Sequence, residues 1–330
     1  MQTNMTIFTI VIPVKEINDY VRETVPYIQS LNDSRWELLI IPNEFQRNEW
    51  ENDERIRVIA SGRVGPAAKR DLALNVGSGE LLVFFDDDSF PRNDYFAGVE
   101  EVFKDPTIAA IGGPALTPET DSFFQKVSGS VFLSRLTGGN PERYLPVGER
   151  KFVDDWPSVN FIIKRDVFRK IGGFNSPYWP GEDTHLCLKI VNTGLKIVYM
   201  PDLIVWHHRR SGLLRHIRQV GAYGLHRGYF ARHMPETSRR IKYFMPSIVP
   251  IQLLSLFLLP FTPVAIDRLL QLGVLIYLAV LLGGTFDIMR KSNPAIALFS
   301  IPFVVSTHVS YGINFIKGFL RRTELVSKLR

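Results

Sequence analysis

A continuous apolar run, Leu81 to Phe85, ends abruptly in three carboxylates, Asp86 to Asp88. A short run of this kind, bounded by Gly79 and Pro91, is typical of a strand buried on both faces of a sheet. In an open α/β sheet, ligands bind where the strands end at their carboxyl edge. Three adjacent carboxylates repel one another, so we expect a cation there, and hard oxygen ligands suit Mg²⁺ or Mn²⁺. The alternative is a solvated acidic turn that caps the next helix.

Strand-like and helix-like segments alternate around this run, which predicts an α/β fold with a mostly parallel, doubly wound, Rossmann-like sheet flanked by helices. Residues 114–150 are rich in glycine and proline, and we expect a mobile, substrate-facing insertion there. The expected helices cover 19–31, 66–74, 95–103, 166–171 and a segment that begins at Gly181 and ends at Gly194. The expected strands are Ile7–Val14, Trp36–Ile41, Ile56–Ala60, Leu81–Phe85, Ile108–Gly113, Val159–Lys164, Lys196–Met200 and Leu203–Trp206.

The charge of the chain is distributed unevenly. The formal net charge is +6, but residues 1–206 hold 22 basic and 29 acidic residues, or −7. Residues 207–242 hold 9 and 1, or +8, and residues 243–330 hold 8 and 3, or +5. We therefore predict a globular domain over 1–210, a basic segment over 211–243 and a membrane region over 244–330. The single cysteine, Cys187, argues against a disulfide framework and fits a reducing compartment, and we expect no secretory signal before the first strand.

Three long apolar runs dominate the last quarter: Phe244–Ile266, Leu269–Met289 and Ala295–Phe319. About 20 apolar residues span a bilayer as a helix, so we expect an integral membrane protein. Three crossings would place Arg321 and Arg322 opposite the catalytic domain, against the positive-inside preference. Two crossings with one interfacial segment would return the basic tail, and the prolines of the first run favour that run as the shallow one. Both counts stay open.

The basic segment has leucine, isoleucine and valine at helical spacing, interleaved with arginine. This pattern is typical of an amphipathic helix on a membrane surface, attracted to anionic lipids. Arg218 and Tyr223 are candidates for holding an acceptor's phosphates. Nucleic-acid binding is excluded as the partner class, because the basic segment leads directly into the apolar runs.

An ordered set of short motifs resembles the family 2 glycosyltransferases of the GT-A fold. The resemblance covers residues 6–210. The motifs are the strand end at Pro13–Glu16, Gly65-Pro-Ala-Ala-Lys-Arg-Asp71, Phe-Phe-Asp86-Asp-Asp88, Gly-Gly-Phe174, Gly181-Glu-Asp183 and Val-Trp-His207. The apolar tail resembles that of members which act on lipid-linked acceptors.

The resemblance implies a nucleotide-sugar site with a divalent metal, Mg²⁺ or Mn²⁺. Asp88 would bind the metal, Asp86 would approach the donor's ribose, and Asp87 would contact the donor or share the metal. His207 would complete the metal site, although the sequence leaves open whether it or His208 points inward. The further donor-binding candidates are Pro13, Val14, Lys15 and Glu16 along the base and ribose, Asn43 at a base-recognising position that is often acidic, and Arg70 on base or phosphate. An ordinary strand-end turn and a solvent-facing helix arginine are the alternatives for Pro13–Glu16 and Arg70.

Asp183 is the candidate general base, because inverting transfer needs a carboxylate to accept the proton of the attacking hydroxyl. Two acids at a helix start also stabilise the helix dipole, which would need no catalysis. Trp179 would stack on a sugar or anchor a loop, and Glu182 would orient the acceptor.

The predicted function is metal-dependent, inverting sugar transfer from a nucleotide-sugar donor to a lipid-linked or membrane-proximal acceptor in glycan assembly. The catalytic domain is expected on the cytoplasmic face. The alternatives are a synthase that charges polyprenyl phosphate with one sugar, and a catalytically silent membrane scaffold with the same fold.

Overall fold

The structure is a computed structural model that describes residues 6–256 and 263–325. The described chain forms two compact units. The first comprises the residues up to Leu116 together with Leu145–His207, and the second comprises Thr117–Tyr144 and His208–Leu325. The boundaries predicted at residues 210 and 243 stay a prediction.

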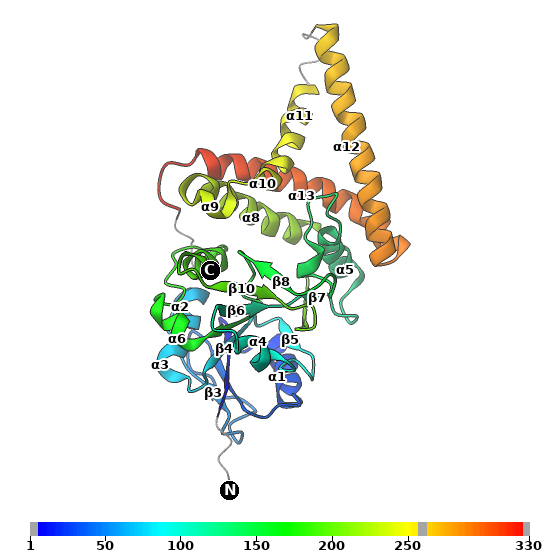
Figure 1. Cartoon of the computed structure of the whole chain (residues 1–330). Helices are drawn as coiled ribbons and strands as arrows, with labels where there is room; N and C mark the ends of the chain where they lie inside the picture. The colour runs from blue at the N-terminus through cyan, green and yellow to red at the C-terminus, as the bar shows by residue number, and fades with distance from the viewer. Residues whose placement is uncertain (1–5, 257–262, 326–330) are drawn as a thin grey trace. The chain divides into compact units, whose positions relative to one another are not determined.

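An eight-stranded sheet forms the centre of the first unit (Figure 1). Its strand order is β3-β2-β1-β4-β9-β6-β10-β8. Seven of these strands were predicted from their apolar runs. Strands β1, β2, β3, β4, β6 and β10 lie at or close to their predicted bounds, and β9 begins one residue later than expected. The bounds are β1 Phe8–Pro13, β2 Trp36–Ile41, β3 Ile56–Val58, β4 Leu81–Phe85, β6 Ile108–Gly112, β8 Lys151–Val153, β9 Asn160–Lys164 and β10 Lys196–Tyr199.

The sheet is mostly parallel, as predicted, and two of its strands run antiparallel to their neighbours. Strand β9 lies antiparallel between β4 and β6, and β8 pairs antiparallel with the edge of β10. Only residues 154–159 separate these two strands along the chain. Mixed sheets of this size are common. The parallel strands β1, β2 and β4 still end at one carboxyl edge.

Both faces of the sheet are covered, as the buried apolar runs predicted. Helices α1 (Asp19–Gln29) and α4 (Val99–Phe103) contribute to one core, and α2 (Pro66–Asp71), α6 (Arg165–Lys170) and α7 (Glu182–Asn192) contribute to the other. The helix predicted over 66–74 divides at Leu72 into α2 and α3 (Ala73–Val76). The helix predicted from Tyr95 starts only at Val99, because Gly98 adopts a left-handed conformation with φ 72°.

A second, three-stranded sheet was not predicted. It contains β5 (Ser89–Pro91), β11 (Val205–His207) and β7 (Ala115–Leu116) in that order. Each strand has only two or three residues, too few for a recognisable apolar period. The strand predicted at Leu203–Trp206 is β11, shifted toward His207.

The second unit is helical. Residues 117–144, predicted as part of a mobile insertion, contain helix α5 (Phe123–Ser130), which starts with a capping box between Ser122 and Gln125. Short helices α9 (Pro235–Ser238) and α10 (Ile241–Phe244) follow the long helix α8 (Leu213–His233). The first apolar run includes α11 (Ile248–Leu256), and its residues 257–262 lie outside the described residues. Helices α12 (Val264–Lys291) and α13 (Pro294–Leu320) contain the two spans that are long and apolar enough to cross a membrane, Ile266–Lys291 and Pro294–Leu320.

Helix α13 lies lengthwise beside α8, whereas α12 rises steeply from them (Figure 1). The two backbones approach closely at glycines: a Cβ on Gly228 would lie 2.0 Å from the carbonyl oxygen of Phe315, and one on Gly318 would lie 2.0 Å from that of Leu225. Of the apolar side chains predicted to define α8, Val220 is buried, whereas Leu214 is 71 % exposed. The placement of α8 on a membrane surface stays a prediction.

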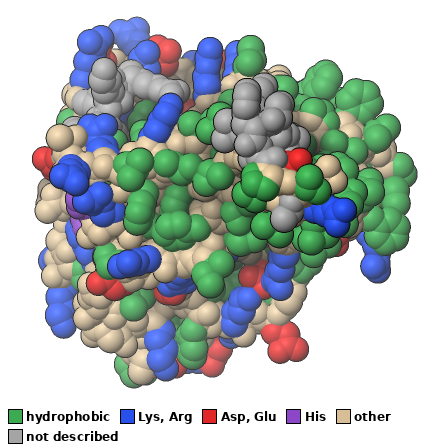
Figure 2. All heavy atoms as spheres, turned by 90° about the horizontal axis from the view of Figure 1, so that it is seen from above, with side chains coloured by type: hydrophobic (Ala, Val, Ile, Leu, Met, Phe, Trp, Pro, Cys, Tyr) green, Lys and Arg blue, Asp and Glu red, His purple; other side chains and the backbone are tan. Residues whose placement is uncertain are grey.

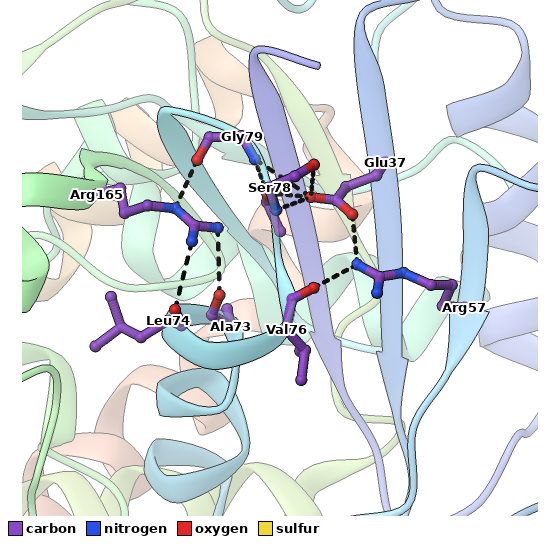
Figure 3. A network of polar contacts seen from close by, with 9 residues as sticks. Glu37, Arg57, Ala73, Leu74, Val76, Ser78, Gly79 and Arg165 are labelled. Atoms are coloured by element: carbon purple, nitrogen blue, oxygen red, sulfur yellow. Dashed lines mark hydrogen bonds and ion pairs between the residues drawn. The ribbon is translucent and has the colours of Figure 1, made fainter. Parts of the chain in front are cut away.

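A buried carboxylate fixes the turn that leads into β4 (Figure 3). Glu37 of β2 accepts hydrogen bonds from Thr9 Oγ1 at 2.7 Å, from the backbone N–H and hydroxyl of Ser78, and from Arg57 at 2.6 Å. Arg165 holds the same turn from the other side by donating to the carbonyl of Gly79 at 2.6 Å. Burial by itself would raise the pKa of Glu37, but the Ser78 N–H and the other donors outweigh it and lower the pKa.

Replacing Glu37 with glutamine should lower the free energy of unfolding by about 3 kcal/mol, because the amide nitrogen opposes buried donors. Since the folded pKa lies below the unfolded value of about 4.3, the contribution of Glu37 should be present above that pH and should decline as the pH falls through the folded pKa. Denaturant unfolding of the full chain in detergent, with pH varied, measures both. The matched control is Glu100→Gln, whose exposed pair with Arg35 should contribute less than about 1 kcal/mol. Equal losses in the two variants would contradict the assigned role.

Candidate active site

Three parallel strands deliver polar residues to the carboxyl edge of the sheet. Asp86 to Asp88 follow β4 directly, in a turn closed by Ser89, whose N–H donates to the carbonyl of Asp86 at 3.2 Å. Asp88 is only 6 % exposed, and Asp86 is half-buried. Asp87 accepts from the amide of Asn18 at 2.7 Å. The alternative of a fully solvated acidic turn therefore does not describe these residues.

His207 joins two of these carboxylates. Strand β11 pairs with β5 so that His207 lies opposite Ser89, next to Asp88 along the chain. Its Nε2 lies 3.0 Å from Asp88 Oδ1, and one ligand atom from each of Asp86, Asp88 and His207 lies within 4.8 Å of the others. His208 turns elsewhere, with its Nδ1 2.5 Å from Asp121 Oδ1. Of the two histidines, His207 is thus the one beside the aspartates.

The donor set of this group fits a small divalent cation. Two carboxylates and one imidazole, contributed by two different sheets, are the ligand types that Mg²⁺ and Mn²⁺ accept. Asp86 Oδ1 already accepts a hydrogen bond from Arg70 at 2.6 Å. Asp88 and His207 are consequently the stronger pair of ligands, because one oxygen of Asp86 is already paired with the guanidinium of Arg70.

Arg70 connects the acidic turn to the start of α7. The side chain, on α2, is buried with the residue 2 % exposed, so the alternative of a solvent-facing arginine is wrong. One nitrogen donates to Asp86 at 2.6 Å and another to Glu182 at 3.3 Å, while its guanidinium lies 5.4 Å from the ring centre of Phe174. A single guanidinium therefore holds carboxylates from two segments that lie 96 positions apart in sequence (182 − 86).

Helix α7 begins with the two acids. Gly181 adopts φ 114°, a conformation that favours glycine, and aims the next residues into the start of the helix. Burial raises the pKa of Glu182, and the negative charge of Asp183 raises it further. Asp183 is half-buried and accepts from the N–H of Thr184 at 2.8 Å. Trp179, just before the helix, is 38 % exposed.

The exits of β1 and β2 are joined by a lysine that the sequence analysis missed. Lys69 of α2 is 4 % exposed, and its Nζ donates to the carbonyl of Val14 and, at 2.7 Å, to Oδ1 of Asn43. Burial lowers the pKa of Lys69 to about 8, and the charge of Asp87 partly opposes this. Its one sequence signal is its position beside Arg70, in a helix that begins near the carboxyl edge.

Residues 81–291 match the family model described as glycosyl transferase family group 2. The chain belongs to that family. The predicted resemblance is confirmed at this level.

Two relatives of this family 2 member illustrate the range of similarity. The pre-mycofactocin glycosyltransferase of Mycobacterium tuberculosis is 26 % identical over 223 residues, which cover 66 % of this chain and 46 % of the relative. The chain thus spans less than half of that relative's length. A Methanococcus voltae protein, the dolichyl N-acetyl-α-D-glucosaminyl phosphate 3-β-D-2,3-diacetamido-2,3-dideoxy-β-D-glucuronosyltransferase, is 21 % identical over 316 residues. That similarity covers 92 % of this chain and 90 % of the relative.

The predicted GT-A fold is confirmed by a solved structure. The mannosyltransferase PcManGT of Pyrobaculum calidifontis, in complex with GDP-Man and Mn²⁺, superposes with a TM-score of 0.53 at 15 % identity. The similarity covers 98 % of this chain and 89 % of PcManGT. At this identity the likeness establishes the fold of this family 2 member and nothing about its substrates.

The remaining predicted site residues of this family 2 member differ in how far they are buried. Pro13 and Val14 are buried at the end of β1, whereas Lys15 and Glu16 are exposed beyond it. Arg218 and Tyr223 are exposed on α8, in the second unit, and their role toward an acceptor stays a prediction. The binding and catalytic roles predicted for the other site residues also stay predictions, supported by the contacts described above.

Asp71 has a structural role in the turn that carries Phe174. Its carboxylate accepts from the backbone N–H groups of Phe174 and Asn175, and thereby fixes the turn after Gly173. This turn carries the ring that packs against Arg70. Asp71 therefore supports Arg70 through the turn that carries Phe174.

Proposed function

We propose that this family 2 glycosyltransferase moves a sugar, with inversion, from a nucleotide-sugar donor to a lipid-linked or membrane-proximal acceptor. The observation that carries the proposal is the juxtaposition around Arg70. The group of Asp86, Asp88 and His207 lies on one side of its guanidinium and the Glu182–Asp183 pair on the other. Sugar transfer needs both elements: a site for the diphosphate and a carboxylate for the attacking hydroxyl.

Asp88 and His207 would hold Mg²⁺ or Mn²⁺, with Asp86 alongside. When bound, such a cation neutralises charge on a diphosphate leaving group. Arg70 adds a fixed cation on the same side, and its burial makes that charge effective because little water screens it. Asp86, oriented by Arg70, is placed to accept from a ribose hydroxyl.

Asp183 would accept the proton of the acceptor hydroxyl as its oxygen attacks the anomeric carbon. Glu182 is less suited to this step, because it is buried and its carboxylate is engaged by Arg70. Asp183 is half-buried and lies one residue further along α7. Glu182 instead positions Arg70.

The acceptor is proposed to be lipid-linked because the relative that matches nearly the whole chain is named for a dolichyl phosphate-linked acceptor. Apolar helices α12 and α13 support a location at a membrane. The test is to incubate the full chain in proteoliposomes with Mn²⁺, radiolabelled nucleotide sugars and a panel of lipid acceptors. We expect label in lipid-linked glycan. Label on polyprenyl phosphate alone would favour the synthase alternative, and failure of folded protein to consume any donor would favour the silent scaffold.

The membrane is proposed to be crossed by α12, whose residues 269–286 contain no Asp, Glu, Lys or Arg. At about 1.5 Å per residue these 18 positions extend about 27 Å, close to the hydrocarbon thickness of about 30 Å. Asp267 and Arg268 precede this stretch, and Asp287, Arg290 and Lys291 follow it. Many of its leucines and isoleucines are exposed. Hydrophobic side chains gather on the face seen from above in Figure 2.

Helix α13, by contrast, would lie in the plane of the membrane surface. Its contact with α8 begins where His216 meets Thr307 at 2.7 Å and ends where His233 meets the carbonyl of Arg321 at 3.2 Å. Arg215, Arg218 and Arg232 are exposed on α8, and each would cost about 2.5–3.5 kcal/mol at the centre of a bilayer. Because α13 cannot enter the hydrocarbon along this contact without α8, we infer that the third apolar run is the interfacial one. The two crossings are then assigned to the first and second runs, which differs from the shallow first run that its prolines favoured. The arginines of α8 and the basic residues after α13 then lie on one side of the membrane, which the positive-inside preference assigns to the cytoplasm.

Cysteine labelling in sealed inverted vesicles tests this topology. In a Cys187→Ser background, a membrane-impermeant maleimide should label Glu324→Cys from the same side as Arg239→Cys, and Arg268→Cys only after permeabilisation. All three positions are exposed. Labelling of Glu324→Cys together with Arg268→Cys would show that α13 crosses the membrane and would overturn the two-crossing proposal.

A further inference from the structure

The contact between Lys69 and Asn43 fixes which atoms the end of β2 can present to a ligand. Lys69 Nζ lies 2.7 Å from Asn43 Oδ1. An ammonium group has three donors and no acceptor, so it is the carboxamide oxygen of Asn43 that must face Lys69. The amide nitrogen, with its two N–H donors, is therefore directed away from Lys69.

The backbone of Asn43 is also held, so the side chain is not re-aimed by moving the loop. Its N–H donates to the carbonyl of Lys15 at 3.1 Å, and its carbonyl accepts from the N–H of Gly62 at 2.9 Å. Lys69 is anchored in turn, because its Nζ also donates to the carbonyl of Val14 and its side chain is buried. Asn43 itself is half-buried, so a ligand can reach it.

This arrangement lies between the exits of β1 and β2, on the carboxyl edge that carries the acidic turn. Under the proposed function, the base of the donor nucleotide would lie here. We propose that Lys69 is a specificity-determining residue: it locks the Asn43 carboxamide so that the site meets the base with N–H donors and selects an acceptor atom on it, a carbonyl oxygen or an unprotonated ring nitrogen. Lys69 acts through Asn43 and is therefore a positioning residue. This inference rests on the proposed function.

The chemistry behind the selection is the difference between an amide and a carboxylate. A carboxylate at the end of β2 would accept from a ring N–H of the base, as it has only acceptors. A free asparagine could rotate its amide and serve either kind of base atom. With its oxygen occupied by Lys69, Asn43 offers donors alone. A base that presents an N–H at that point would place this N–H against the amide N–H of Asn43, and neither donor would have an acceptor. Sites built on such hydrogen bonds discriminate strongly, because the wrong partner leaves buried polar groups unpaired.

The test measures nucleotide binding and needs no turnover. The dissociation constants of UDP, dTDP, GDP, CDP and ADP are determined with Mn²⁺ at pH 7 for the full chain in detergent, as wild type and as Lys69→Met. Methionine has a similar length and no donor, so it releases the amide of Asn43. We expect the ratio between the best and the second-best nucleotide to fall about 10-fold or more, which corresponds to the loss of about one hydrogen bond's discrimination.

Lys69 also carries a charge, and the design separates the two effects. If Lys69 only attracts the diphosphate, Lys69→Met should weaken all five nucleotides by the same factor and leave their ratios unchanged, which would overturn the proposal. Asn43→Asp, which presents only oxygen, should shift the preference toward bases with an N–H at the contact. Asn43→Leu, which has neither donor nor acceptor, should flatten the preference, and it keeps the proposal testable if Lys69→Met does not fold.

The matched control is Lys189→Met. Lys189 is another partly buried lysine, and its Nζ donates to the carbonyls of Gly173 and Phe174 at 3.2 and 2.8 Å. Its loss should leave the nucleotide ratios as in the wild type. Failure of all five nucleotides to bind the wild type would overturn the proposed function itself, whereas selective binding that is insensitive to Lys69→Met and Asn43→Leu would overturn only the role of Lys69 and Asn43.

Discussion

Replacing Asp183 with asparagine should lower the rate of sugar transfer about 100- to 10,000-fold, the range that a positioned general base contributes. The amide has nearly the shape of the carboxylate but cannot accept the proton of the acceptor hydroxyl. The dissociation constant of the nucleotide with Mn²⁺ should stay near the wild-type value, because the proposed mechanism assigns Asp183 no role in holding the metal or the nucleotide. Single-turnover transfer assays and nucleotide titration measure the two quantities separately.

The rival role for Asp183 is stabilisation of a helix start, and the fold offers a matched control. Asp166 is the second residue of α6, as Asp183 is the second residue of α7. It accepts from the N–H of the next residue at 2.7 Å, against 2.8 Å for Asp183. If Asp183 served only the helix dipole, Asp183→Asn and Asp166→Asn would each cost less than about 1 kcal/mol of stability and would both retain transfer. Normal transfer by Asp183→Asn would defeat the assignment of the base.

The features that the sequence predicted well share a local cause. Strands β1, β2 and β4 are predominantly apolar runs that end at or next to a proline or an aspartate, and their bounds followed from that contrast. The position of Asp86 to Asp88 at a strand end followed in the same way. Periodicity records only whether a segment is buried, so it gave β9 as a strand but could not give its direction in the sheet.

The features that the sequence did not predict depend on long-range contacts. Arg70 and Glu182 lie 112 positions apart, and nothing in either segment indicates that their side chains meet. Lys69 is similar, because a lysine in a short helix is usually solvated, and only the exits of β1 and β2 on either side make its burial favourable. In both cases a buried cation is stabilised by oxygen acceptors from other segments, which a one-dimensional pattern does not contain.

Helix α8 shows that apolar spacing can predict a helix without predicting what packs against it. Its leucines and arginines have helical spacing, and the helix is present over Leu213–His233. The buried side includes glycines and histidines as well as apolar residues, and the close contact with α13 requires residues without bulk at Gly224 and Gly228. A hydrophobicity scale assigns such residues little weight, so apolar spacing alone could not identify the packed side.

Replacing Asp88 with asparagine should remove metal-dependent transfer, with a loss of about 1,000-fold. The estimate follows from a stabilisation of several kcal/mol by a cation at a developing charge, where about 1.4 kcal/mol is a factor of ten. Asparagine keeps one oxygen but lacks the charge that Mg²⁺ or Mn²⁺ prefers. The apparent dissociation constant for Mn²⁺ in the presence of a nucleoside diphosphate should rise in parallel, and metal titration of binding and of transfer measures both.

The adjacent histidines provide the control that separates a ligand from a merely buried side chain. His207→Asn should raise the dissociation constant for Mn²⁺, because His207 Nε2 is the nitrogen 3.0 Å from Asp88. His208→Asn should leave that constant unchanged, although it breaks the contact with Asp121 and should lower the stability of the folded chain. A ligand role for His207 requires that the two variants differ in metal affinity, whereas a purely structural role requires that they differ only in stability. Equal Mn²⁺ titrations for the wild type, Asp88→Asn and His207→Asn would place the cation elsewhere and would remove the acidic turn from the proposed mechanism.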